Sequence, residues 1–165
     1  MSKTTLEWSQ EIDRRRDGMI ALRRDFHRHP ELSFEEQRTA QISAERLTAA
    51  GLEVRTGIGK TGVVGVLHGD RPGRTVAWRA DIDALPLTEL LDAPFVSGKP
   101  GVMHACGHDG HAAIGVTLAE VLAGRRRDMP GTAVFLFQPA EEVFGGARPM
   151  IEAGVLERPR VDEVY

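Results

Sequence analysis

The sequence has one cysteine among its 165 residues, and a single thiol excludes an internal disulfide. It has no apolar run near the roughly 20 residues that a membrane-spanning helix needs, and its polar N-terminus lacks the apolar core of a signal peptide. The formal net charge of -3 gives no reason to expect nucleic acid or an anionic membrane as a partner. We therefore expect a cytoplasmic protein that binds neither nucleic acid nor membrane.

The length and the 41% hydrophobic content are those of one domain with a single core. Hydrophobic periodicity and turn residues divide the chain into alternating helical and extended segments. Helices are predicted at 6–27, 33–50, 110–124 and 147–153, and strands at 52–56, 63–68, 75–80, 133–137 and 161–165. This order predicts an α/β layered fold with helices on both faces of a mixed, largely parallel sheet.

Three local patterns refine this prediction. Ser33 and Glu36 fit a capping box, which would open the second helix. Residues 133–137 form a short, continuous apolar run, which is typical of a central strand covered on both faces. A turn is predicted at residues 70–73, where Asp, Arg, Pro and Gly follow one another.

Residues 106–111 bring a thiol, two imidazoles and a carboxylate together within six positions. The thiolate of Cys106 and the imidazole of His108 are good ligands for zinc and similar metals. Gly107, between them, removes a side chain that would crowd two donors converging on one ion. The alternative interpretation is a buried structural cysteine in a polar turn, and the cluster by itself leaves both open.

Paired carboxylates follow two of the predicted strands, where the loops of an α/β fold usually carry the ligand site. Asp81 and Asp83 come directly after the strand at 75–80, and Glu141 and Glu142 come shortly after the strand at 133–137. Neighbouring carboxylates repel each other unless a cation or a proton separates them. The alternative is that the two glutamates lie in the first turn of a helix, where the helix dipole favours negative charge.

Four motifs in this chain resemble those of the metal-dependent amidohydrolases that include hippurate hydrolase, N-acetyl-diaminopimelate deacetylase and the indole-acetyl-amino-acid hydrolases. They are residues 26–33 (FHRHPELS), 79–86 (RADIDALP), 103–111 (MHACGHDGH) and 138–142 (QPAEE). The resemblance extends over nearly the whole chain. Four separate motifs in the same order make it specific.

The resemblance implies a role for each of the chemically active residues. Cys106 matches a thiolate ligand that can bridge two divalent ions, and His108 and Glu142 match further ligands. Glu141 matches the general base that activates a metal-held water. Asp83, counted with Glu141 as a catalytic residue, would hydrogen-bond a metal ligand without binding the metal itself.

The remaining polar residues of the motifs are expected not to bind the metal. Asp81 stands where the wider metallopeptidase group has a histidine, and it is not assigned as a ligand. Four histidines are expected to be structural: His27, His29, His104 and His111. For His104 and His111, which are near the site in sequence, the ring nitrogens are expected to have hydrogen-bond partners.

The same resemblance implies two divalent ions per complete site and a small N-acyl amino acid as substrate. A mixed sulfur, nitrogen and oxygen ligand set admits zinc or manganese, and also cobalt or nickel. Complete relatives are expected to be homo-oligomers. Cys106 as a covalent nucleophile is the less favoured alternative, because His108 suits shared ligation and no motif indicates a thiol-protease dyad.

The chain departs from the family in length. Family members carry an inserted lid and dimerisation domain and further histidine ligands, whereas no histidine follows His111 here. Residues 1–165 are therefore expected to be the N-terminal part of the metal-binding catalytic domain. Two hypotheses follow: the chain is part of an amidohydrolase, or it is a catalytically silent fragment that binds metal weakly through Cys106, His108 and Glu142.

We predict that the purified 165-residue chain hydrolyses N-acyl amino acids very slowly or not at all when zinc or manganese is added. The reason is that ligands and the lid supplied elsewhere in the family are absent. Release of the free amino acid is the measurement. Substantial metal-dependent turnover that disappears in Glu141→Gln would overturn this prediction.

Overall fold

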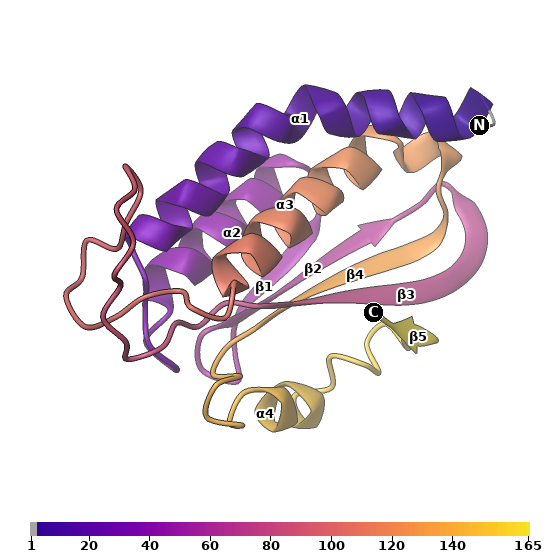
Figure 1. The fold of residues 1–165 in the computed structure, drawn as a ribbon. Coiled ribbons are helices and arrows are strands. Elements are labelled where there is room, and N and C mark those ends of the chain that lie inside the picture. Colours follow the sequence, from indigo (N-terminus) through magenta and orange to yellow (C-terminus); the bar gives the residue numbers. More distant parts are fainter. Residues whose placement is uncertain (1–2) are drawn as a thin grey trace.

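The computed structural model describes residues 3–165, which form helices layered on a five-stranded sheet (Figure 1). The helices are α1 (Lys3–Arg28), α2 (Gln37–Ala49), α3 (His108–Gly124) and α4 (Ala147–Glu152), with a short 3-10 helix η1 (Arg126–Asp128). The strands are β1 (Glu53–Ile58), β2 (Gly62–His68), β3 (Arg71–Asp81), β4 (Pro130–Gln138) and β5 (Glu163–Val164). No helix in the described range is both long and apolar enough to cross a membrane.

The sheet has the strand order β1-β2-β4-β3-β5 and is mixed. β1 pairs with β2 and β2 with β4 in antiparallel fashion, whereas β3 pairs in parallel with both β4 and β5. The connection from β3 to β4 runs through α3, as a crossover between parallel strands requires. The predicted α/β fold with a mixed sheet is confirmed, with two parallel and two antiparallel pairings.

Helices lie on both faces of this sheet, as predicted. α1, α2 and α3 cover one face, and the short α4 lies on the other (Figure 1). β4 is covered on both sides. This coverage explains its continuous apolar run, because successive side chains of a strand point to opposite faces. Phe135 and Phe137 enter the core under α1 to α3, whereas Val134 and Leu136 pack towards α4.

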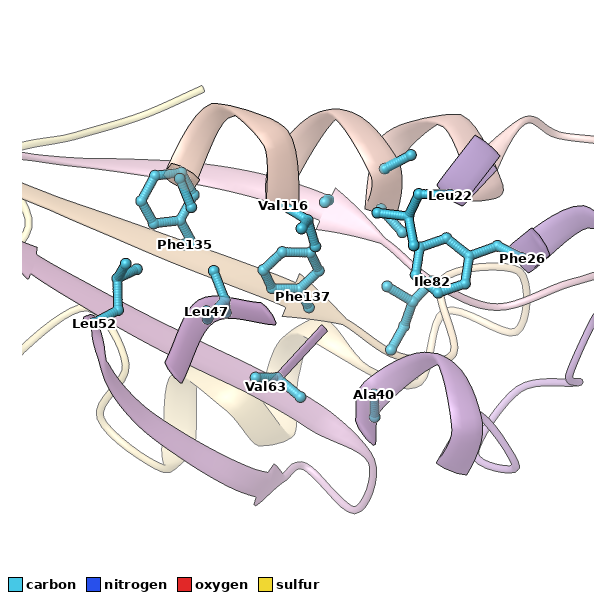
Figure 2. Packing of buried hydrophobic residues seen from close by; sticks show 14 of the residues in the cluster. Leu22, Phe26, Ala40, Leu47, Leu52, Val63, Ile82, Val116, Phe135 and Phe137 are labelled. Atoms are coloured by element: carbon cyan, nitrogen blue, oxygen red, sulfur yellow. The ribbon is translucent and has the colours of Figure 1, made fainter. Parts of the chain in front are cut away.

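The larger core lies between the three helices and the sheet (Figure 2). Phe26 of α1, Leu47 of α2 and Val116 of α3 are completely buried there, as is Phe137 of β4. A β-carbon at Gly115 would lie only 3.3 Å from the Phe137 ring, so the helix sits close against the strand. This packing fixes the position of α3, whose first residues carry the candidate site.

The predicted capping box is wrong. α2 begins at Gln37, and its N-cap residue, Glu36, makes no side-chain capping hydrogen bond. The Ser33 hydroxyl instead donates to Asp83, and the Glu36 carboxylate accepts hydrogen bonds from Thr61 and from the backbone of Ala140. Partners from distant segments therefore outcompete the local capping pattern at both positions.

Other boundaries differ by a few residues. β3 begins at Arg71, inside the stretch predicted as a turn, because Arg71 pairs with Pro130 before the register shifts. α3 begins at His108, earlier than predicted, and β5 is limited to two residues. The early start of α3 places His108 and Asp109 in its first turn.

Replacing Phe137 with alanine is predicted to lower the free energy of unfolding by about 3–5 kcal/mol, because a fully buried ring is lost and a cavity remains. Urea denaturation measures the change. Ile114→Ala, on α3 and 44% exposed, is the matched control and is expected to cost less than about 1 kcal/mol. Equal losses in the two variants would contradict the packing described for Phe137.

Candidate metal centre

The carboxyl ends of β3 and β4 lie side by side and bring the polar groups of the sequence together. Asp81 is in register with Gln138, and the Ile82 amide donates to the Gln138 carbonyl at 3.0 Å. The chain leaving β3 therefore delivers Asp83 next to the turn after β4, which carries Glu141 and Glu142. The start of α3 reaches the same place, since its first residue, His108, contacts Asp83.

The structure places one ligand atom from each of Cys106, His108 and Glu142 within 4.8 Å of one another. His108 is buried, Glu142 is partly buried and Cys106 is exposed, so the group opens to solvent on the thiol side. The exposure of Cys106 is at odds with the alternative of a buried structural cysteine. Glu141 and Glu142 lie in a turn that ends before α4, which overturns the alternative of a helix N-terminus.

Gly107 has a role in the backbone that the sequence did not indicate. A β-carbon at this position would meet no atom within 4 Å beyond those of its two chain neighbours, Cys106 and His108. Gly107 has φ +87° and is the N-cap residue of α3. A left-handed backbone is readily adopted by glycine alone, and here it turns the chain so that Cys106 and His108 face the same point.

Asp83 orients the His108 ring. Nδ1 of His108 lies 3.1 Å from Asp83 Oδ1 and 3.0 Å from the Asp83 carbonyl oxygen. Both atoms are acceptors, so Nδ1 carries the proton and Nε2 keeps a free lone pair. That Nε2 lies 3.9 Å from Glu142 Oε1 and 3.9 Å from Glu141 Oε2.

Asp83 also holds the turn that carries the two glutamates. Its Oδ2 accepts hydrogen bonds from the Ser33 hydroxyl at 2.8 Å and from the Glu142 amide at 3.0 Å. Burial alone would raise the pKa of Asp83, but the hydrogen bonds from His108, Ser33 and the backbone outweigh burial and hold that pKa below its ordinary value. Asp83 is therefore an ionised acceptor at neutral pH.

The electrostatics of the site suit a cation. A hydrogen bond to the Glu142 carboxylate raises the pKa of the Cys106 thiol, and burial and the surrounding negative charges raise it further. Burial lowers the pKa of His108, but the hydrogen bond to Asp83 and the charges of Asp81 and Asp83 outweigh burial and raise it. Oε1 of Glu142 is buried and has no hydrogen-bond partner within residues 3–165. A sulfur, nitrogen and oxygen donor set with an unpaired carboxylate oxygen fits a divalent metal ion.

Glu141 lies at the edge of this group. Its Oε1 is 4.0 Å from the Arg79 guanidinium, and its side chain is about one-third exposed. The residue is thus close to the three donors without being enclosed by them.

A second group of donors was not predicted. Asp81, His108 and His111 also offer ligand atoms within 4.8 Å of one another, and the rings of His108 and His111 stack with centroids 5.2 Å apart. The signal was the i, i+3 spacing of the two histidines on one helix. Because Arg79 already pairs with Asp81 and only Nε2 of His108 is free, we do not place a further ion there.

His104 is not the satisfied histidine that was expected. It is 4% exposed, and neither of its ring nitrogens finds a hydrogen-bond partner in the described part of the chain. Burial is the largest influence on its pKa and lowers it to about 4, so the ring is neutral at physiological pH.

His27 connects three segments: its own helix α1, the first turn of α3 and the loop that carries Glu89. Its Nδ1 lies 2.7 Å from Asp109 in the first turn of α3, and its Nε2 lies 2.9 Å from Glu89. Arg23 pairs with the same Asp109 at 2.7 Å. This agrees with the expected structural role of His27. His29 is exposed and contacts the Asp25 carbonyl of its own helix.

Comparison with known proteins gives the context of this geometry. The sequence profile of Peptidase family M20/M25/M40 matches residues 77–165. The N-acyl-L-amino acid amidohydrolase of Geobacillus stearothermophilus is 48% identical over 147 residues, which cover 88% of this chain and 40% of that protein. The hippurate hydrolase of Campylobacter jejuni is 46% identical over 144 residues, which cover 87% of this chain and 37% of that protein.

A solved structure shares both the fold and much of the sequence. The Bacillus subtilis YXEP protein, a dinuclear metal-binding peptidase of the M20 family, superposes with a TM-score of 0.84 at 44% identity. The match covers 90% of this chain and 41% of that one. The chain therefore spans about two fifths of the length of these relatives.

The Glu89 contact generates a pH prediction for the metal-free chain. Burial raises the pKa of Glu89, but the hydrogen bonds from His27 and Ser97 and the charges of His27 and Arg23 lower it below the ordinary 4.5. A lowered pKa adds stability that is present above pH 4.5 and is lost as the pH falls through the lower folded-state pKa. We expect Glu89→Gln to be less stable than the parent chain at neutral pH.

The gap in unfolding free energy between Glu89→Gln and the parent should persist down to pH 4.5 and shrink below it. Urea denaturation across this pH range is the measurement. Glu152→Gln, on the exposed surface of α4, is the control and should show no such change with pH. A gap that widens in acid would contradict the direction of the pKa shift.

Proposed function

The chain belongs to the peptidase family M20/M25/M40, and on that premise we propose that it supplies the general base and part of the divalent-metal site of an amidohydrolase acting on N-acyl amino acids. The observation that carries the proposal is the convergence of Cys106, His108 and Glu142 within 4.8 Å, with Glu141 beside them. The names of its relatives, which include hydrolases of acylated amino acids, support the substrate class.

Cys106, His108 and Glu142 would hold the metal. Cys106 is the candidate for a bridging ligand, because a thiolate can serve two ions and the thiol lies on the open side of the group. The dinuclear site of the related Bacillus subtilis peptidase supports a pair of ions. Zinc or manganese suits the donor set, and cobalt or nickel also does. Residues 1–165 would be the N-terminal part of the metal-binding domain.

The bound ion would supply Lewis-acid chemistry and lower the pKa of water towards about 7. Glu141 would accept a proton from the attacking water as the water oxygen bonds to the amide carbonyl carbon. Glu141 then passes the proton to the amide nitrogen as the carbon–nitrogen bond breaks, which releases a carboxylate and an amino acid. The same side chain therefore acts first as base and then as acid.

Neighbouring residues contact Glu141 and orient the ligand His108. The Arg79 guanidinium lies 4.0 Å from the Glu141 carboxylate. Asp83 fixes the proton of His108 on Nδ1 and so directs the Nε2 lone pair towards the other donors. The substrate is a small molecule, and a homo-oligomer is the assembly that we propose for the complete protein.

Titration with Co²⁺ tests the metal site. The parent chain is expected to bind Co²⁺ with a thiolate-to-metal absorption band, which Cys106→Ser should abolish. Glu142→Gln should weaken binding by about tenfold or more, because a charged ligand becomes neutral. Glu141→Gln serves as the matched control and should bind Co²⁺ as the parent does. Equal binding by the parent and by Cys106→Ser and Glu142→Gln would refute the proposed site.

The role of Glu141 is tested separately at saturating Co²⁺. Any turnover of N-acetyl or N-benzoyl amino acids should fall by about 10²- to 10⁴-fold in Glu141→Gln, because general base catalysis is lost. The dissociation constant for Co²⁺ should stay the same. Turnover that survives this substitution would assign the proton transfer to another group.

A further inference from the structure

The turn that carries Glu141 and Glu142 adopts an uncommon backbone. Ala140, directly before Glu141, has φ +50°, a left-handed conformation that a residue with a side chain rarely adopts. Phe144 in the same turn has φ +54°. Such conformations persist only where the surroundings impose them. The structure must therefore contain groups that hold this turn.

Glu36 is one of these groups, although it lies far away in the sequence. Its side chain is completely buried at the N-terminus of α2. Oε1 accepts a hydrogen bond from the Ala140 amide at 2.9 Å, and Oε2 accepts one from the Thr61 hydroxyl at 2.5 Å. Each carboxylate oxygen thus has a donor, and one donor is the backbone of the turn itself.

A buried carboxylate in this arrangement fixes geometry strongly. An acidic group that is removed from water must keep its hydrogen-bond donors, because losing one leaves an uncompensated buried acceptor. Glu36 stands on α2, which packs against α3 and the sheet and so provides a rigid base. The Ala140 amide is consequently held at a fixed distance from the core.

Glu36 and Asp83 hold neighbouring parts of one turn. Asp83 accepts from the Glu142 amide at 3.0 Å, whereas Glu36 accepts from the Ala140 amide, two residues earlier. Asp83 faces the candidate metal site, and Glu36 approaches from the α2 side. The backbone on either side of Glu141 is therefore tied to a buried carboxylate.

We propose that Glu36 is a positioning residue for the metal centre: by holding the Ala140 amide it sets the turn that brings Glu142 to Cys106 and His108. The inference rests on the proposed function of that centre. Glu36 touches neither metal nor substrate, and its effect passes through the backbone of the turn.

A double-mutant cycle with Glu142 tests this inference on the 165-residue chain, with the Co²⁺ dissociation constant as the measurement. Glu36→Met removes both acceptor atoms with little change of volume, and it should weaken Co²⁺ binding by about tenfold or more. The thiolate band should remain at saturating Co²⁺, because Cys106 and His108 lie outside the turn. In a Glu142→Gln background, Glu36→Met should cause no further loss.

Two further variants separate positioning from general damage. Glu36→Gln keeps an acceptor for the Ala140 amide, and it should bind Co²⁺ nearly as the parent does. Leu47→Ala removes a fully buried side chain from the same helix, away from the turn. It should lower the melting temperature without changing the dissociation constant measured well below that temperature.

The outcomes distinguish this inference from the proposed function. If Glu142→Gln binds Co²⁺ as the parent does, the metal centre itself is refuted. If Glu142→Gln weakens binding and Glu36→Met does not, or if the two losses simply add, only the role of Glu36 is refuted. Should Glu36→Met fail to fold, Thr61→Val takes its place, because it removes the hydroxyl that donates a hydrogen bond to the Glu36 carboxylate. Its smaller loss of affinity must likewise vanish in the Glu142→Gln background.

Discussion

The parallel pairing of β3 with β4 is the constraint on which the candidate site depends. Because Asp81 and Gln138 lie in register, the two chains leave the sheet at the same edge, and their loops must share one space. α3 connects these strands and packs over them, with Val116 of α3 and Phe137 of β4 in the same core. The first turn of α3 lies at that edge of the sheet. Three segments that are distant in sequence therefore meet where their polar residues can act together.

Buried carboxylates then fix the geometry of these loops by accepting hydrogen bonds from them. Asp83 accepts hydrogen bonds from His108, Ser33 and the turn of Glu142. Asp109 ties the first turn of α3 to His27. Glu36 holds the turn before Glu141. Each of these acidic groups is buried and hydrogen-bonded, which stabilises one arrangement against others that would leave an acceptor unpaired.

Much of the architecture could be predicted from periodicity and turn residues. The apolar run at 133–137 indicated a strand covered on both faces, and β4 is that strand, because its alternate residues enter different cores. The polar residues that follow two of the predicted strands leave the sheet at the same edge, because those strands are parallel neighbours in register. Local rules failed where a side chain had a better distant partner. Ser33 and Glu36 match a capping box in spacing, yet both serve the turn and loop at the site.

The sequence by itself determined the order of helices and strands, the family resemblance and the residue types available for a metal site. These follow from patterns that are local along the chain. The tertiary structure decided that His108 keeps Nε2 free, that Gly107 is needed for its left-handed backbone and that His104 is buried without a partner. It also paired Glu36 with Ala140, 104 positions away. A buried hydrogen bond depends on the distance between two folded segments, and no local pattern encodes that distance.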